Sequence, residues 1–384
     1  MALRSRVLLA AAMAVPLALA TACGGGNSAG GNSGGGNAGS LDPPAAAGGG
    51  IPSGPAPGPQ SISENGSSLL FPLMQTWAAA YRRQHPNVSI STGKLGSKVG
   101  IADAADGRVD IGASDAYLPS AILVEHSALL NIPLAVSAQQ INYNVPGLRP
   151  DVHLKLSPKV LVGMYEGTIK TWNSPLIAAL NRGVRLPSTP VVPVHRLDGS
   201  GDTFLFTSYL STEFSAWSHT YGYGTTVAWP GNVPRARSAT GNSGMLALCE
   251  QVKGCVAYIG IAYLAQATKA GLGYAELQNK MSAWELPSPA AINAAVTPFV
   301  STTPANETIS MINGPAAKGY PIVNYEYAIV SSRPPDAAKA RDIKAFLHWV
   351  ITQGNAPQFL GPARFQRLPP AIESLSDAQI AKIG

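Results

Sequence analysis

From Ser61 to the C-terminus, the apolar positions of the chain alternate between two spacings. Short apolar runs at residues 61–63, 88–91 and 109–113 have the length of buried strands. Between them, apolar side chains recur every three or four positions, which predicts helices such as the one carrying Leu73, Trp77 and Tyr81. Further strands are predicted at 136–145, 191–196 and 325–331, and further helices at 101–106, 161–165, 177–180, 203–210 and 335–351. This order predicts an α/β fold with two lobes rather than one closed barrel.

Small polar loops follow several of these strands and open the next helix. They are Gly66-Ser67-Ser68-Leu69, Gly96-Ser97-Lys98-Val99-Gly100 and Ser200-Gly201-Asp202, and the strand Ile111-Gly112-Ala113-Ser114 ends in Asp115. Helix N-termini carry free N–H groups and a partial positive charge, so they attract anions. A Ser at such a position also caps a helix without any ligand. Each loop taken singly is therefore consistent with a cap or with an anion site.

Arg196 favours the anion site. It ends an apolar strand, two residues before Asp198 and four before Ser200. A guanidinium can hold a tetrahedral oxyanion through two hydrogen bonds, and Asp198 could orient it as a supporting partner. The alternative is a surface ion pair, which would be worth about 0–1 kcal/mol.

The first 60 residues differ in composition from the rest. Two arginines precede an apolar run at residues 7–20, and small residues lead into Cys23, which predicts a signal peptide over residues 1–22. The junction resembles a bacterial lipobox, in which the Cys at the cleavage site carries a lipid; the alternative is an ordinary cleaved signal. Residues 24–60 are mostly Gly, Asn, Ser, Ala and Pro, so residues 23–60 are predicted to be a lipidated Cys followed by a disordered tether.

Composition excludes several classes of protein. Hydrophobic residues make up 46% of the 384 residues, which is enough for a core, and charged residues only 12%. The net charge of +6 comes from scattered Lys and Arg, so no nucleic-acid partner is expected. With 3 Cys and no H-E-x-x-H spacing, no metal or cofactor is expected. In an exported protein, the short spacing of Cys249 and Cys255 suggests a disulfide.

The polar loops, taken together and in order, resemble the PstS-type phosphate-binding proteins of ABC importers, in particular an actinobacterial lipoprotein branch. Supporting stretches are Tyr165-Glu166-Gly167-Thr168-Ile169-Lys170-Thr171-Trp172 and Cys255-Val256-Ala257-Tyr258-Ile259-Gly260. The resemblance implies a two-lobed periplasmic-binding-protein-like fold (Venus-flytrap, type II) with the ligand cleft between the lobes. It places residues 61–135 and 325–384 in lobe 1 and residues 136–324 in lobe 2, with hinges near 135 and 325.

The resemblance also implies a set of phosphate-binding residues. They are Ser68, Leu69 (through its backbone N–H), Ser97, Asp115, Arg196, Ser200, Gly201 and Asp202, with Asp198 orienting Arg196. Asp115 matches the carboxylate that accepts a hydrogen bond from the ligand's own proton. Lys94 and Lys98 stand where relatives usually have small residues.

The implied function is capture of inorganic phosphate at the outer face of the cytoplasmic membrane by a lipid-anchored monomer, and delivery to the permease of an ABC importer. The alternatives are another tetrahedral oxyanion as ligand, or an anion-binding surface lipoprotein with an adhesin or signalling role. No catalysis is expected. The residue types of a serine hydrolase triad occur close together, in Ser200, His195 and Asp198, but the glycines around Ser200 do not have the G-x-S-x-G spacing of a nucleophile elbow.

Overall fold

The computed structural model describes residues 50–384 of the chain. The predicted signal peptide, Cys23 and residues 24–49 of the predicted tether lie outside the described residues. Within residues 50–384, no helix is both long enough and apolar enough to cross a membrane.

The described chain alternates strands and helices, as predicted. The strands are β1 (Gln60–Gly66), β2 (Val88–Ser91), β3 (Ile111–Ser114), β4 (Leu129–Asn144), β5 (Lys155–Leu156), β6 (Val192–Arg196), β7 (Arg237–Ala239), β8 (Cys255–Gly260), β9 (Gly273–Tyr274), β10 (Glu276–Gln278), β11 (Trp284–Glu285) and β12 (Val323–Ser331). The helices are α1 (Phe71–Gln84), α2 (Ser97–Ala105), α3 (Ser120–Glu125), α4 (Pro158–Tyr165), α5 (Pro175–Leu180), α6 (Gly201–Glu213), α7 (Ser215–Thr220), α8 (Gly241–Gln251), α9 (Leu264–Lys269), α10 (Pro289–Val296), α11 (Ala337–Ile351), α12 (Pro357–Ala363) and α13 (Pro370–Ile380). Three short 3-10 turns, at Ile261–Tyr263, Thr297–Phe299 and Gln353–Asn355, complete the set.

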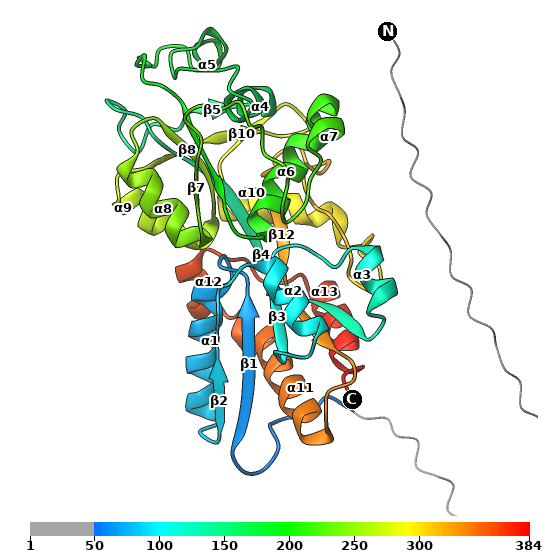
Figure 1. Ribbon diagram of the computed structural model, residues 1–384. Coiled ribbons are helices and arrows are strands. Elements are labelled where there is room, and N and C mark those ends of the chain that lie inside the picture. Colours follow the sequence, from blue (N-terminus) through cyan, green and yellow to red (C-terminus); the bar gives the residue numbers. More distant parts are fainter. Residues whose placement is uncertain (1–49) are drawn as a thin grey trace, which may run out of the picture. The chain divides into compact units, whose positions relative to one another are not determined.

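The main sheet runs through two lobes. Its order is β2-β1-β3-β12-β4-β8-β6-β7, with β9 also paired to β4. Parallel strands β1, β2 and β3 form one half with helices α1, α2 and α11, and parallel strands β6, β7 and β8 form the other with α4, α6 and α8 (Figure 1). These halves are lobe 1 and lobe 2, and the two-lobed fold predicted from the sequence is confirmed.

The long antiparallel strands β4 and β12 join the two lobes (Figure 1). The alternation of apolar and polar residues predicts a strand over residues 136–145, which covers only the second half of β4. In the structure β4 begins at Leu129, and Pro133 pairs with Tyr327 beside a β-bulge between Glu326 and Tyr327. A bulge tolerates a proline because it locally interrupts the ladder of hydrogen bonds.

Residues 50–60 differ from the disordered tether predicted for them. The backbone N–H of Ala56 donates to Oδ1 of Asp342 on α11 at 2.8 Å, and Ala56 is buried. The side chain of Asn87 donates to the carbonyls of Ala56 and Gly58, and Gln60 already belongs to β1. A Pro- and Gly-rich segment has little apolar area to bury, but here its backbone groups are held by polar partners on lobe 1.

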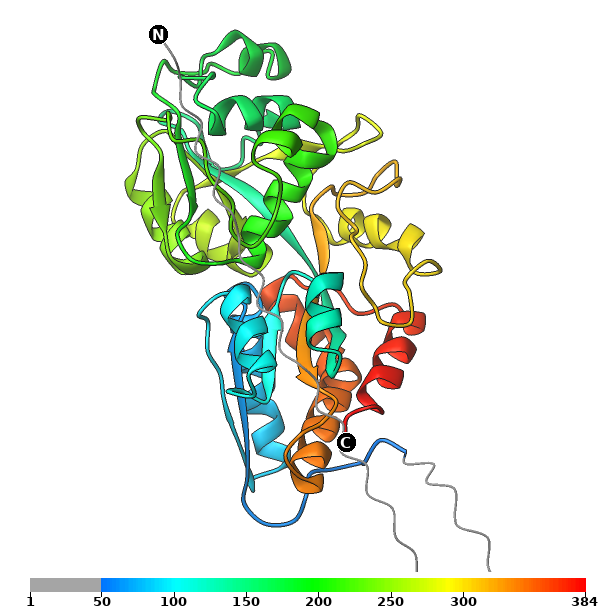
Figure 2. The ribbon, with the colours of Figure 1, turned by 45° about the vertical axis from the view of Figure 1, so that its right-hand side comes forward.

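A part of the chain assigned to lobe 2 by the prediction lies against lobe 1. Ser376 on α13 donates to Oε1 of Glu307 at 3.0 Å, and Gln379 donates to the carbonyl of Ala305 at 2.9 Å. Asn131 on β4 donates to the carbonyl of Glu307 at 3.0 Å. Figure 2 shows this yellow segment beside the red α13. Residues 305–307, which the prediction assigned to lobe 2, therefore pack with lobe 1. The predicted lobe boundary at 324 stays a prediction.

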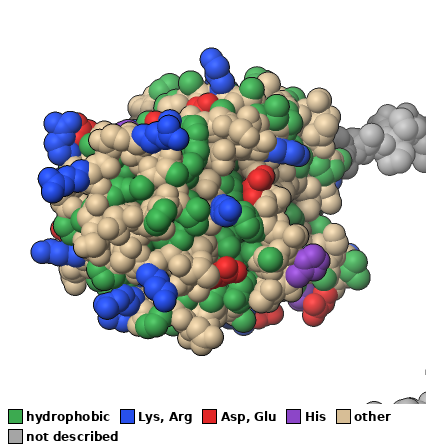
Figure 3. Space-filling view, turned by 90° about the horizontal axis from the view of Figure 1, so that it is seen from above, with side chains coloured by type: hydrophobic (Ala, Val, Ile, Leu, Met, Phe, Trp, Pro, Cys, Tyr) green, Lys and Arg blue, Asp and Glu red, His purple; other side chains and the backbone are tan. Residues whose placement is uncertain are grey.

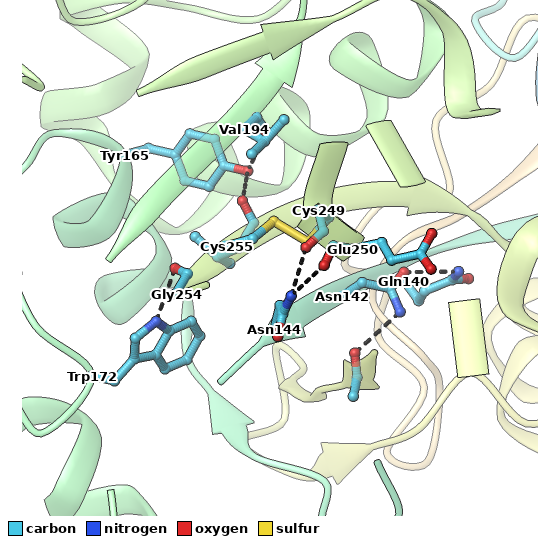
Figure 4. The surroundings of a disulfide bond; sticks show 12 residues. Gln140, Asn142, Asn144, Tyr165, Trp172, Val194, Cys249, Glu250, Gly254 and Cys255 are labelled. Atoms are coloured by element: carbon cyan, nitrogen blue, oxygen red, sulfur yellow. Dashed lines mark hydrogen bonds between the residues drawn. A yellow bond between two sulfur atoms is a disulfide. The ribbon is translucent and has the colours of Figure 1, made fainter. Parts of the chain in front are cut away.

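Cys249 and Cys255 form a disulfide between the end of α8 and the start of β8. Asn144 donates to the carbonyls of Cys249 and Glu250, and the indole of Trp172 donates to the carbonyl of Gly254 (Figure 4). Both sulfurs lie in the core of lobe 2, where they fix a tight helix-to-strand turn.

The double variant C249A/C255A should unfold at lower urea concentration than the unmodified chain. Chain entropy for so short a loop corresponds to about 2 kcal/mol. Urea denaturation measures the loss in the free energy of unfolding. The matched control is the unmodified chain with dithiothreitol in the denaturant, which reduces the disulfide without changing the sequence. Equal midpoints for the double variant and the oxidised chain would contradict a stabilising role.

Candidate functional site

The polar loops singled out in the sequence meet between the two lobes. The loop after β1 and the start of α2 come from lobe 1, and the loop from β6 to α6 and the start of α8 come from lobe 2 (Figure 1). Strand β6 of lobe 2 runs antiparallel to β1 and β3 of lobe 1. The carboxyl ends of the strands therefore face each other between the lobes, and carboxyl ends are where α/β proteins bind ligands.

The loop after β1 places two hydroxyl groups and two backbone N–H groups in this region. Oγ of Ser67 accepts from the backbone N–H groups of Leu69 (3.1 Å) and Leu70 (2.9 Å), and its hydroxyl donates to Oδ1 of Asp115. Oγ of Ser68 accepts from the backbone and side-chain amides of Asn242 on α8, at 3.1 and 3.0 Å. Ser68 thus links lobe 1 to lobe 2, while Ser67 contacts the buried acid.

The start of α2 contacts lobe 2 through its backbone. The N–H of Lys98 donates to the carbonyl of Gly199 at 3.2 Å, and Oγ of Ser97 accepts from the N–H of Asp115 at 3.2 Å. Gly96 has φ of 100°, and a Cβ on it would lie 2.5 Å from the Gly199 carbonyl oxygen. Only a glycine allows the two loops to approach this closely.

Arg196, at the end of β6, is held by two carboxylates. Its Nε donates to Oδ1 of Asp198 at 2.8 Å and its Nη2 to Oδ2 of the same carboxylate, so Asp198 holds the guanidinium by a two-point contact. Its Nη1 donates to Oδ2 of Asp202 at 2.6 Å. The side chain of Arg196 is 1% exposed, which excludes the surface ion pair considered from the sequence.

The start of α6 faces Asp115 and Ser97. Oγ of Ser200 caps the helix by accepting from the N–H of Asp202 at 3.0 Å. A Cβ on Gly201 would lie 2.5 Å from Oδ2 of Asp115 and 2.7 Å from Oγ of Ser97. Gly201 therefore brings the N-terminus of α6 directly against the acid at the end of β3. All eight residues predicted to bind the ligand are buried between these loops.

The chain matches known proteins over most of its length. A sequence profile described as a PBP superfamily domain matches residues 52–353. The phosphate-binding protein PstS of Methanocaldococcus jannaschii is 32% identical over 323 residues, covering 79% of this chain and 82% of that protein. The chain belongs to the PstS family of phosphate-binding proteins, within the PBP superfamily.

Other relatives agree with this assignment. The phosphate-binding protein PstS 2 of Mycobacterium tuberculosis is 29% identical and covers 87% of both chains. Among solved structures, a high-affinity periplasmic phosphate-binding protein (PfluDING), bound with phosphate at pH 8.5, superposes with a TM-score of 0.65 at 21% identity, covering 82% of this chain and 92% of that one. The resemblance drawn from the sequence motifs is confirmed.

The ionisable groups of this PstS-family site differ in their affinity for protons. Burial and the charge of the neighbouring Asp202 together raise the pKa of Asp115 to about 7, against the lowering effect of Glu326, Ser67 and Arg196. Burial also raises the pKa of Asp202, against the attraction of Arg196. Although burial opposes it, the hydrogen bond and charge of Arg196 hold the pKa of Asp198 below its usual value. Asp198 is therefore the permanent anion that balances Arg196.

Sequence reasoning missed four side chains that the structure brings to the site: Ser67, Gln139, Asn242 and Glu326. Asn242 donates to Oδ2 of Asp202 at 2.7 Å and accepts from the N–H of Gly260 at 2.7 Å. Asn242 follows Gly241 at the start of α8, so the pattern of a small polar loop that opens a helix could have indicated it. Gln139 donates to Oδ1 of Asp202 at 3.1 Å from the middle of β4, where only a polar residue inside an apolar strand could have indicated it.

Gly96→Ala should destabilise the chain more than Gly107→Ala. Both glycines have positive φ, but a Cβ at 107 meets nothing within 4 Å, whereas one at 96 meets the Gly199 carbonyl. A positive φ costs each variant about 1–2 kcal/mol of backbone strain. The excess in Gly96→Ala reports the contact with Gly199 together with the added strain at φ 100° and ψ 150°, a conformation that glycine alone adopts readily. Urea midpoints measure both variants, and equal losses would show that the contact contributes nothing.

Asp115 should make the folded chain less stable as pH rises from about 4 to about 7. The folded-state pKa of about 7 lies above the usual value of 3.8, so in this range the folded chain keeps a proton that the unfolded chain has lost. Stability conferred by that proton disappears as pH passes the folded pKa. Asp115→Asn should make the slope measured by chemical denaturation shallower by the contribution of one proton. The rest of the slope stays, because burial also raises the pKa of Glu64 to about 8 and that of Glu307 to about 9. Asp106→Asn, at an exposed position, should leave the slope unchanged.

Proposed function

We propose that this chain binds inorganic phosphate between its lobes and delivers it to the permease of an ABC importer, without catalysing a reaction. The observation that carries the proposal is that Asp115 and Arg196, both buried, meet at the N-termini of α2 and α6 between the two lobes. Membership of the PstS family supports the same function.

The donors of the site suit a phosphate anion. Arg196 supplies a cation, Ser68, Ser97 and Ser200 supply hydroxyl groups, and helix starts supply backbone N–H groups. Leu69 contributes only its N–H, which Oγ of Ser67 accepts in this structure. Binding exchanges such internal hydrogen bonds for bonds to the ligand.

Selectivity for phosphate over sulfate follows from the carboxylate of Asp115. Near neutral pH phosphate keeps at least one proton, whereas sulfate keeps none. An ionised Asp115 accepts a hydrogen bond from phosphate but meets only lone pairs and negative charge on sulfate. Leaving a buried polar group unpaired costs about 1–3 kcal/mol, and more for a charged one. Asp202 adds a second acid, which increases the site's preference for a protonated ligand.

The chain is proposed to work as a lipid-anchored monomer outside the cytoplasmic membrane. Cys23 is the proposed site of the lipid, and the residues after it are the proposed tether.

Figure 3 looks onto lobe 2, where Lys and Arg side chains stand apart rather than in one continuous basic stripe. This distribution agrees with a small anion as ligand rather than a nucleic acid.

Calorimetric titration of phosphate into the full chain tests the function. The protein is first unfolded and refolded to remove bound ligand. We expect one saturable site whose phosphate affinity is unchanged by excess sulfate. Arg196→Lys should weaken binding about 100-fold or more, because two charged hydrogen bonds worth about 1.5–3 kcal/mol each are disturbed. Asp115→Asn should weaken phosphate binding and let sulfate compete.

Exposed positions provide matched controls: Arg235→Lys and Asp106→Asn make the same chemical changes outside the site and should bind phosphate like the unmodified chain. No saturable heat in the unmodified chain, or equal competition by sulfate, would refute the proposed function.

A further inference from the structure

Glu326 is a buried acid that the proposed phosphate contacts do not include. It lies on β12, at the bulge where that strand passes from one lobe to the other, and its side chain has no exposed surface. Lys and Arg residues within 50–384 form no ion pair with it, because the one guanidinium in this region, that of Arg196, pairs with Asp198 and Asp202.

The two oxygens of Glu326 have different surroundings. Oε1 accepts from the hydroxyl of Ser137 at 2.5 Å and from the amide of Asn324 at 3.0 Å. Oε2 is buried and accepts no hydrogen bond from any donor among the described residues. An ionised carboxylate with one oxygen unpaired in the core would be costly, whereas a carboxylic acid with its proton on Oε2 needs only an acceptor.

Asp115 is the acceptor that adjoins this acid. Asn324 ties the two together, since its amide donates both to Oε1 of Glu326 and to the main-chain carbonyl of Asp115, at 3.0 and 3.1 Å. The other ionisable groups nearby are Arg196 and Asp202, across the site, and Tyr327 on the same strand.

We propose that Glu326 is a positioning residue: as a neutral acid it donates a hydrogen bond to the carboxylate of Asp115 and so keeps Asp115 an acceptor for the ligand's own proton. The inference rests on the proposed function for its link to phosphate, but the hydrogen bond itself does not.

The direction of both pKa shifts agrees with this arrangement. Burial raises the pKa of Glu326 well above its usual value, and the charge of Asp115 raises it further. The hydrogen bond from Glu326 in turn lowers the pKa of Asp115. Glu326, behind the site, thus holds one proton, and Asp115, in the site, is ionised for a larger share of the time.

Carboxyl carbon-13 NMR of the full chain tests the hydrogen bond without any ligand. The Glu326 signal, assigned by its absence in Glu326→Gln, should report a protonated carboxyl at neutral pH. Asp115 should titrate in Glu326→Gln within about half a pH unit of the unmodified chain, because the amide still donates, and at higher pH in Glu326→Leu. An ionised Glu326 at neutral pH, or an Asp115 titration that Glu326→Leu leaves unchanged, would overturn the proposal.

Ligand selectivity supplies the second measurement. The ratio of sulfate to phosphate dissociation constants in Glu326→Gln should stay within about threefold of the unmodified chain. In Glu326→Leu it should fall about tenfold or more at neutral pH, because a protonated Asp115 can donate to sulfate, and recover as pH rises. A purely structural role would weaken both anions equally and leave the ratio unchanged.

Glu307 provides the matched control. It is also a buried acid with one oxygen unpartnered among the described residues, but it bonds Ser376, away from Asp115. Glu307→Gln and Glu307→Leu should change neither the Asp115 titration nor the anion ratio. Failure of the unmodified chain to bind phosphate would refute the proposed function alone, since the NMR titration still decides whether Glu326 donates to Asp115. If Glu326→Leu does not fold, the protonation of Glu326 in the unmodified chain is the deciding measurement.

Discussion

The burial of charge between the lobes is the constraint on which the rest of the structure depends. One guanidinium and several carboxyl groups lie out of water, and each such group is costly unless it is paired or neutral. The structure meets this requirement with Asp198 and Asp202 around Arg196, with amides from Gln139 and Asn242 on Asp202, and with Ser67 on Asp115. Asn242 also donates to Ser68 of lobe 1, so the polar network holds the lobes against each other.

The long strands β4 and β12 explain why so many polar groups can be buried in one place. Most of their side chains pack in the core, yet Ser137, Gln139 and Asn324 interrupt the apolar pattern at the level of the site. Each is hydrogen-bonded to a neighbour on a different element. Asn324 and Ser137 are paired with each other across β12 and β4, and Gln139 is paired with Gly260 on β8, which keeps these side chains at fixed positions beneath the loops.

Much of the site could be predicted because its residues follow strands and open helices, which is a local pattern. Arg196, Ser200 and Asp115 were found in this way. Glu326 could not be found, since its role depends on a bulge and on a neighbour about two hundred positions earlier. The start of α2 was predicted too late for a similar reason. The sequence predicts a loop at Gly96 and Ser97 and a helix from residue 101, whereas α2 begins at Ser97, where its first turn contacts Gly199 of the other lobe. Residues 50–60 fold against α11 through backbone partners that composition does not indicate.

The attachment of residues 50–60 has a mechanical consequence. Ala56 is joined to Asp342, and the backbone carbonyl of Gly54 accepts from Arg341, so the chain enters the folded body along α11, within lobe 1. A pull from the N-terminal side is therefore transmitted to lobe 1, while lobe 2 is connected to it through β4 and β12. If the two lobes move apart to admit a ligand, residues 50–60 therefore move with lobe 1 and not with lobe 2.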